Sequence, residues 1–257
     1  MNHNNIGGPL KVAVLGAQGR MGTEAVHAVD NARDLQLVCT ISHGDSLQQL
    51  LVSGAQVAVD LTVPSATEDN VRFCVENGIH CVVGTTGWDD DRLARLSELL
   101  TTHPHVGVLI APNFSVGAVL AMRFSAIAAR FFESAEIIEL HHPDKVDAPS
   151  GTATRTAGLV ARAREQAGLG ECPDATETDP DGARGATVEG INVHSVRLRG
   201  LVAHQETLLG NDGEMLTIRH DSFDRVSFMS GVLLGVRTIP VTPGLTHGLE
   251  HFMDLGA

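Results

Sequence analysis

The chain has 257 residues, of which 43% are hydrophobic and 19% charged, and this ordinary globular composition argues against disorder, fibrous repeats and coiled coils. Its 31 acidic and 18 basic residues give a formal net charge of −13. Binding to nucleic acid or to an anionic membrane relies on clustered positive charge, so we expect neither partner, whereas a small anionic substrate needs only a local group of cations.

The first half of the chain alternates short apolar strands with helices. Strands are expected at 11–15, 35–41, 57–62, 81–83 and 106–110, and helices at about 20–31, 65–77 and 89–102. Such a βαβαβ series predicts an α/β fold with a Rossmann-type, doubly wound parallel sheet. Any α/β fold shows this alternation, so by itself it identifies no cofactor.

The second half has a different pattern. A helix from 116 to about 132, a strand at 135–140 and a helix at 150–166 precede a polar loop at 171–184. The strands that follow, at 192–198, 205–209 and 214–220, are joined by glycine-containing turns, which favours an antiparallel or mixed sheet. A last apolar helix at about 228–238 is expected to return to the first domain. We therefore predict a dinucleotide-binding domain at 1–115 and 228–257, and an inserted α+β domain at 116–227, with hinges near 115 and 227.

The cysteines and the N-terminus bear on the cellular compartment. Cys39, Cys74, Cys81 and Cys172 form no CxxC pair and show no spacing typical of metal ligands. The first residues lack the basic and apolar segments of a secretory signal, and no apolar run reaches the roughly 18 residues of a membrane span. We expect a reduced, cytoplasmic protein, and we expect the polar segments 1–9 and 171–184 to be mobile.

A glycine-rich loop directly follows the first expected strand and opens the first helix. It has the spacing GxxGxxG, with Gly16 for a tight turn, Gly19 for close approach of a pyrophosphate and Gly22 for helix–sheet packing. The strict GxGxxG pattern is not met because Gln18 takes the middle position. The context favours dinucleotide binding over a purely structural turn.

The end of the second strand bears on the choice of cofactor. NAD-binding folds commonly place a carboxylate there, but here the strand ends at Ser42 and His43, and the first acid is Asp45. Ser42 or His43 could accommodate a 2′-phosphate, and Arg20 could pair with it. The sequence favours NADPH slightly, or use of both NADPH and NADH.

Two short segments follow the fourth and fifth strands, GTTG at 84–87 and APNF at 111–114. Each taken alone is more often a plain turn. Because the carboxyl ends of parallel strands form the ligand-binding edge of an open sheet, both segments are expected beside the glycine loop, near the nicotinamide.

A cationic segment, ELHHPDKVDAPSGT at 139–152, is the candidate catalytic loop. His141, His142 and Lys145 bring three cation-capable groups within five residues, and Ser150 begins a helix whose free amides favour anions. Such a group suits a carboxylated substrate and a proton donor. A metal site of the two histidines with Asp144 is a weaker alternative, because no further ligands can be identified.

These segments closely resemble the signature of the 4-hydroxy-tetrahydrodipicolinate reductase (dihydrodipicolinate reductase) family. The resemblance rests on the catalytic loop, on VLGAQGRMG at 14–22, on VVGTTG at 82–87 and on APNF, with later strands at 194–206 and 219–225. It covers roughly residues 11–240. It fails at the first nine residues and at Ser42, where related bacterial sequences often carry an acid.

The resemblance implies an NAD(P)H-dependent enzyme of the diaminopimelate route to lysine, active on a cyclic dicarboxylate and assembled as a homotetramer through the second domain's sheet. It implies that His141 is a proton donor or acceptor, that Lys145 is the proton donor, and that His142, Ser150, Gly151 and Thr152 bind substrate. The implied cofactor contacts are Gly16, Ala17, Gln18, Gly19, Arg20, Met21, Ser42, Gly84, Thr85, Thr86, Ala111, Pro112, Asn113 and Phe114.

Two other functions remain open at this point. Another two-domain dehydrogenase would need a different catalytic loop. A non-catalytic dinucleotide-binding regulator would be expected to have lost the acid and anion-binding residues, yet His141, His142 and Lys145 are all present.

Overall fold

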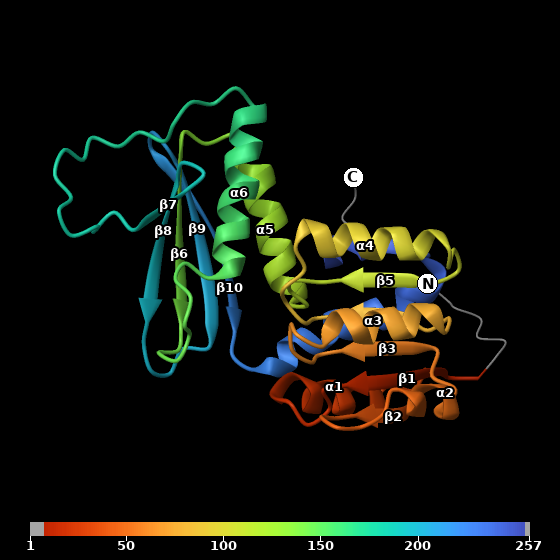
Figure 1. Cartoon of the computed structure of the whole chain (residues 1–257). Helices are drawn as coiled ribbons and strands as arrows, with labels where there is room; N and C mark the ends of the chain where they lie inside the picture. The colour runs from red at the N-terminus through yellow and green to blue at the C-terminus, as the bar shows by residue number, and fades with distance from the viewer. Residues whose placement is uncertain (1–7, 255–257) are drawn as a thin grey trace. The chain divides into compact units, whose positions relative to one another are not determined.

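The computed structural model describes residues 8–254 (Figure 1). The chain divides into two compact units, each described below by itself. The first includes the chain up to Val116 and resumes at Phe228, and the second is Gly117–Ser227. The role of each unit and the hinges near 115 and 227 stay predictions. Residues 1–7, which belong to one of the segments expected to be mobile, lie outside the described residues.

The first unit is built on a six-stranded, wholly parallel sheet in the order β11-β5-β4-β3-β1-β2. Its strands, two of which are buried along their whole length, are rich in β-branched residues, as expected where helices cover both faces. The strands are β1 (Leu10–Leu15), β2 (Leu35–Ile41), β3 (Val57–Asp60), β4 (His80–Val83), β5 (Gly107–Ile110) and β11 (Gly244–His247).

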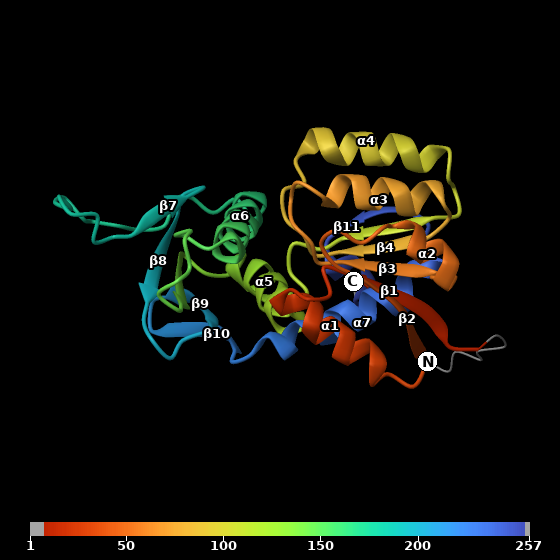
Figure 2. The same ribbon diagram turned by 60° about the horizontal axis from the view of Figure 1, so that its bottom comes forward.

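Helices cover both faces of this sheet, as Figure 2 shows. On one face, α2 (Gln48–Ser53), α3 (Thr67–Glu76) and α4 (Asp90–Thr101) bury Leu50, Val71 and Leu96 in a common core. On the other lie α1 (Arg20–Asp30) and α7 (Met229–Thr238), which contact each other. Short 3₁₀ helices occur at Arg225–Phe228, Ile239–Val241 and Leu249–Phe252.

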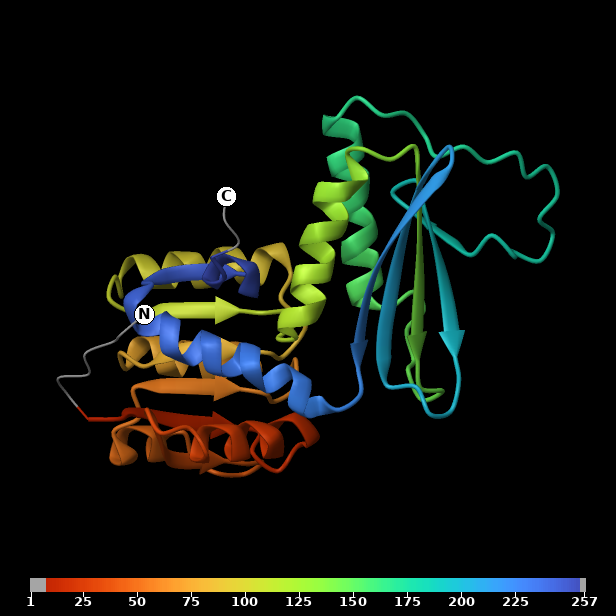
Figure 3. The same ribbon diagram turned by 180° about the vertical axis from the view of Figure 1, so that it is seen from behind.

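The second unit is a five-stranded mixed sheet in the order β10-β9-β6-β8-β7. Two helices, α5 (Val116–Ala129) and α6 (Gly151–Gln166), lie on one side of it (Figures 1 and 3). Ile137 and Leu209 from the sheet pack with Ala157 and Val160 from α6 to form its core. The strands are β6 (Ser134–His141), β7 (Ala186–Val188), β8 (Ile191–Arg197), β9 (Ala203–Asn211) and β10 (Glu214–Ser222).

The predicted fold class is confirmed, since a parallel Rossmann-type sheet is accompanied by a second unit with a mixed sheet. Strand β6 pairs in parallel with β8 and antiparallel with β9. Most expected elements end within three residues of the observed ones. Strand β3 stops at Asp60 because the Asp60 side chain accepts the backbone N–H of Thr62. Three short elements, α2, β7 and β11, were not predicted.

Candidate active site

The glycine loop after β1 is shaped by close contacts that only glycine permits. Gly16 has φ +77°, and a Cβ there would lie 2.5 Å from the backbone oxygen of Leu61. A Cβ on Gly22 would overlap the carbonyl oxygen of Gly16. At Gly19 a Cβ would meet only that same oxygen, at 3.1 Å, and no side chain caps the start of α1. The loop is therefore a backbone cradle in front of a helix N-terminus, which fits the phosphates of a dinucleotide.

A cavity of about 570 Å³ lies at the carboxyl ends of β1 and β3, where the strand order reverses. This is where open α/β sheets bind their ligands. Of the predicted cofactor residues, Gly16, Gln18, Gly19 and Ser42 line it, together with His43 and Asp45. The Ser42 backbone N–H donates to Asp45 Oδ2 at 2.8 Å. The predicted residues Ala17, Arg20 and Met21 do not line this cavity.

The segments after β4 and β5 lie side by side, and none of the predicted cofactor residues in them lines the 570 Å³ cavity. The Ala111 N–H donates to the Val83 carbonyl at 2.9 Å, and a Cβ on Gly84 would lie 2.7 Å from the Phe114 ring. Thr85, Ala111 and Phe114 are buried within the unit, while Thr86 and Pro112 are exposed. Asn113 accepts the Ser115 N–H at 2.8 Å.

A buried carboxylate at the end of β3 organises these loops, and the sequence reasoning missed it. Asp60 accepts from the Thr62 hydroxyl at 2.6 Å, from the Thr85 hydroxyl at 3.1 Å and from the Asn70 amide at 3.1 Å. It thereby ties the turn after β3 to the segment after β4. An acid at the carboxyl end of an apolar strand was the signal that could have indicated it.

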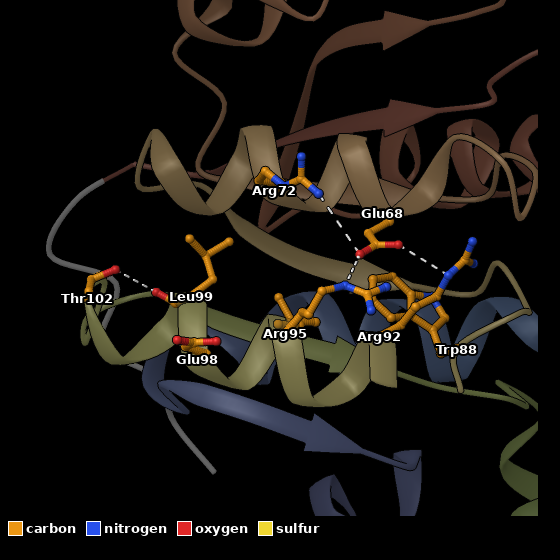
Figure 4. Close-up of a pocket in the computed structure, with 9 residues that line it drawn as sticks. Glu68, Arg72, Trp88, Arg92, Arg95, Glu98, Leu99 and Thr102 are labelled. Carbon is orange, nitrogen blue, oxygen red and sulfur yellow. Dashed lines mark hydrogen bonds and ion pairs between the residues drawn. The ribbon is translucent and has the colours of Figure 1, made fainter. Parts of the chain in front are cut away.

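A second cavity, of about 400 Å³, lies between α3 and α4 beside three arginines (Figure 4). Glu68 accepts from Arg95 Nε at 2.9 Å and pairs with Arg92 Nε at 3.2 Å and Arg72 Nη2 at 4.0 Å. Arg92 also donates to the carbonyls of Pro64 at 3.1 Å and Gly87 at 2.8 Å. This cluster clamps α3 to α4 and supports the loop that contains GTTG. Nothing in the sequence pattern indicated it.

In the second unit, the predicted acid–base residue His141 ends β6 and contacts a buried carboxylate. Its Nδ1 hydrogen-bonds Glu139 Oε2, and Glu139 is 0% exposed. Arg197 binds both oxygens of Glu139, at 2.8 and 2.9 Å. Burial by itself would raise the pKa of the Glu139 carboxyl. Hydrogen bonds from His141 and Arg197, with a further one from Ser195, lower that pKa to about 2.

The predicted proton donor Lys145 lies in the loop that follows. Its Nζ donates to Asp147 Oδ1 at 2.7 Å, and this contact lowers the pKa of the Asp147 carboxyl. The backbone N–H of Lys145 donates to the His142 carbonyl at 3.2 Å, so these two residues belong to one tight turn. The backbone oxygen of Asp147 accepts from Arg197 Nη2 at 2.7 Å, which ties the loop to β8.

The loop leads into the N-terminus of α6. Ser150 is buried and caps the helix, since its hydroxyl accepts the Ala153 N–H at 3.2 Å and its own N–H points to Glu139 Oε1 at 3.3 Å. Gly151 is exposed, and a Cβ there would meet nothing within 4 Å. Thr152 is half-buried. The side chain of Ser150 therefore caps the helix, and the exposed Gly151 hydrogen-bonds the Asp147 carboxylate through its backbone.

Within residues 8–254, no group of three or more His, Cys, Asp and Glu side chains is arranged to hold a metal ion. No helix in the same range is both long and apolar enough to cross a bilayer.

A phosphate cradle at the switch point of a parallel sheet, in a chain with a second unit that carries a cationic loop, is typical of two-domain oxidoreductases that use a nicotinamide dinucleotide. Models of the dihydrodipicolinate reductase N-terminus and C-terminus match residues 10–114 and 117–253. The chain belongs to the dihydrodipicolinate reductase family.

Individual relatives agree. The 4-hydroxy-tetrahydrodipicolinate reductases of Streptomyces coelicolor and Nocardia farcinica are 63% and 60% identical over 246 residues, which is 96% of this chain and 98% and 99% of theirs. The solved structure of dipicolinate-bound dihydrodipicolinate reductase from Paenisporosarcina sp. TG-14 has 38% identity and a TM-score of 0.87, and the match covers 95% of this chain and all of that one. The predicted family and the prediction of an oxidoreductase are confirmed.

Proposed function

We propose that the enzyme reduces the dehydrated form of 4-hydroxy-tetrahydrodipicolinate to tetrahydrodipicolinate with NADH or NADPH, in the diaminopimelate route to lysine. The observation that carries this proposal is the loop of His141, His142 and Lys145 that leads into the N-terminus of α6, where Gly151 is exposed. It suits a small dicarboxylate. The relative from Paenisporosarcina sp. TG-14, at 38% identity, has dipicolinate, a dicarboxylate, bound in its structure.

The cofactor supplies a hydride when it is bound. In this proposal the backbone at 16–21 holds its phosphates, because Gly16 and Gly22 form a cradle that a Cβ would fill. The segments Gly84–Thr86 and Ala111–Phe114 hold the nicotinamide half, and the Asp60 hydrogen bonds to Thr62 and Thr85 keep the first of these segments in place.

Reduction of a conjugated imine leaves an enamine-like anion that must take up a proton. The Lys145 ammonium is the proposed donor, and His141 is a second acid–base group. His142, Gly151 and Thr152 are proposed to bind a substrate carboxylate. The hydrogen bond from Lys145 Nζ to Asp147 Oδ1, at 2.7 Å, fixes the position of the ammonium group in the loop.

The test is substrate-dependent oxidation of NADPH and of NADH, with substrate made in situ from pyruvate and aspartate semialdehyde by the preceding synthase. Lys145→Ala is expected to lower kcat about 10²–10⁴-fold while the Kd of the cofactor changes little. Lys11→Ala is the matched control, since Lys11 is the only other lysine. Equal losses in kcat and cofactor affinity would count against the role of Lys145. A folded wild type that binds dinucleotide but oxidises neither cofactor would favour a regulator.

The proposed cofactor preference is dual use, with a slight tilt to NADPH. Two groups with opposite preferences line the adenosine end of the cavity. Ser42 and His43 can face a 2′-phosphate, whereas the Asp45 carboxylate, held on the Ser42 N–H, can accept from a ribose hydroxyl.

We propose a cytoplasmic homotetramer assembled through the face of the second unit's sheet opposite α5 and α6. Met215 in β10 is an apolar side chain that is 70% exposed, and Leu198, directly after β8, is 59% exposed. The helices α5 and α6 lie on the other side of the sheet. The four unpaired cysteines accord with a reducing compartment. Light scattering of wild type and Leu198→Asp tests the assembly, since a mass that is already monomeric in wild type contradicts it.

A further inference from the structure

We propose that Glu139 and Arg197 are positioning residues that together hold the two acid–base groups, His141 and Lys145, in working geometry. The inference rests on the proposed function and deepens it, because it concerns the same loop. Neither residue stood among the candidate site residues, and both act through their neighbours.

Glu139 lies near the carboxyl end of β6, on the same face of the sheet as Ile137, which packs against α6, and it is 0% exposed. An ionised group in such a place is costly unless it is fully paired. Glu139 is paired with the Arg197 guanidinium through two hydrogen bonds of 2.8 and 2.9 Å, and with the Ser150 N–H at 3.3 Å. Those partners fix each of its oxygens in one place.

The contact with Glu139 determines the tautomer of His141. Since an ionised carboxylate can only accept, the Nδ1 atom of His141 must carry the hydrogen in its bond to Glu139. The other nitrogen, Nε2, is then the one left to exchange a proton with a substrate. A carboxylate behind a histidine commonly serves this purpose in acid–base sites.

Arg197 and Glu139 are also linked to Lys145. Arg197 uses Nη2 both for Glu139 and for the backbone oxygen of Asp147, at 2.7 Å. The Asp147 carboxylate in turn accepts from Lys145 Nζ at 2.7 Å. One guanidinium therefore connects the partner of His141 to the loop that carries the proposed proton donor.

The same strand supplies a matched control. Glu136 also accepts from a histidine and an arginine, His194 Nε2 at 2.7 Å and Arg184. It lies three residues before Glu139, so strand alternation places it on the opposite face. Arg184 also donates to Asp174 in the loop at 171–184, so this pair is connected to that loop and not to Lys145. A Glu136→Gln variant loses equivalent hydrogen bonds without touching the proposed acid–base groups.

The experiment compares kcat, KM and cofactor Kd for wild type, Glu139→Gln and Glu136→Gln, with thermal unfolding and light scattering on each. We expect Glu139→Gln to lower kcat about 100-fold with an unchanged cofactor Kd, and Glu136→Gln to keep kcat within about twofold. Nitrogen NMR of the His141 ring adds a readout that a structural role would not move. It should show the Nδ1-protonated form in wild type and a mixture of tautomers in Glu139→Gln.

Two further variants keep the proposal testable if Glu139→Gln folds poorly. Arg197→Lys retains the charge but not the two-pronged contact, and it should also lower kcat. In a His141→Ala background, Glu139→Gln should lower kcat by a smaller factor than it does in wild type, because part of the effect of Glu139 on kcat depends on His141. An active wild type with full kcat in Glu139→Gln, or a purely additive double variant, overturns the inference. An inactive wild type instead refutes the proposed function.

Discussion

Replacing Gly16 by alanine tests whether the glycine loop is held by its contact with Leu61, the residue after β3. The residue has φ +77°, which costs an L-residue about 1–2 kcal/mol. The new Cβ would also lie 2.5 Å from the Leu61 oxygen and 2.8 Å from the Leu61 carbon, and such overpacking costs about 1–3 kcal/mol more. We therefore expect Gly16→Ala to lower the free energy of unfolding by about 2–5 kcal/mol in total.

Gly78→Ala is the matched control. Gly78 lies in the same unit with φ +73°, but a Cβ there would meet nothing within 4 Å, so it carries the backbone cost alone. The two variants should therefore differ in free energy of unfolding by about 1–3 kcal/mol, and the Tm of Gly16→Ala should be roughly 2–12 °C lower than that of Gly78→Ala.

Thermal unfolding and calorimetric titration with NADPH measure both effects. Gly16→Ala should weaken cofactor binding more than tenfold, because the loop must move to relieve the contact, whereas Gly78→Ala should bind as wild type does. Equal Tm values for the two variants would refute the reasoning, since they would mean that the loop yields without cost.

Three further predictions concern charge. Asp45→Asn should lower the KM for NADPH and raise that for NADH in steady-state assays, and unchanged KM values would remove Asp45 from the site. Arg92→Ala should weaken cofactor binding about tenfold through the lost bonds to Pro64 and Gly87, while Arg72→Ala, which contacts Glu68 only at 4.0 Å, should not. The depressed pKa of Glu139 adds stability above the ordinary value of 4.5, which is lost as the pH falls to about 2. Between pH 5 and pH 2, the free energy of unfolding measured with urea should therefore fall by about 3 kcal/mol less in Glu139→Gln than in wild type. Parallel pH dependence of the two proteins would contradict this.

The parts of the fold that the sequence predicts are those encoded by local patterns. Apolar β-branched runs indicate β1, β2 and β5, and the glycines at 16 and 22 are needed by backbone contacts within a few residues or with the neighbouring strand. Strand β11 was missed because Gly244–His247 has no apolar run, and its parallel pairing with β5 forms only in the folded sheet. Helix α2 is too short, at six residues, to show a helical period.

The role of Asp60 illustrates what a linear pattern omits. Its partners, Asn70 and Thr85, are 10 and 25 residues away, on a helix and on the loop after the next strand. Their convergence depends on the order β4-β3-β1 in the sheet. The sequence can place an acid at the end of a strand, but only the sheet order decides which loops that acid can reach.

The partners of the two glutamates of β6 also depend on how the strands pair. Glu136 and Glu139 have the same chemistry, and each accepts from one histidine and one arginine. Their difference comes from register, since β6 pairs with β8 so that Glu139 faces Ser195 and His141 faces Arg197. A slip of one residue would bring these side chains to the other face and leave the carboxylate without its guanidinium. The arrangement that connects His141 to the Lys145 loop is therefore a property of strand pairing, which is why the His-His-Lys segment could be identified in the sequence while the pair that holds it could not.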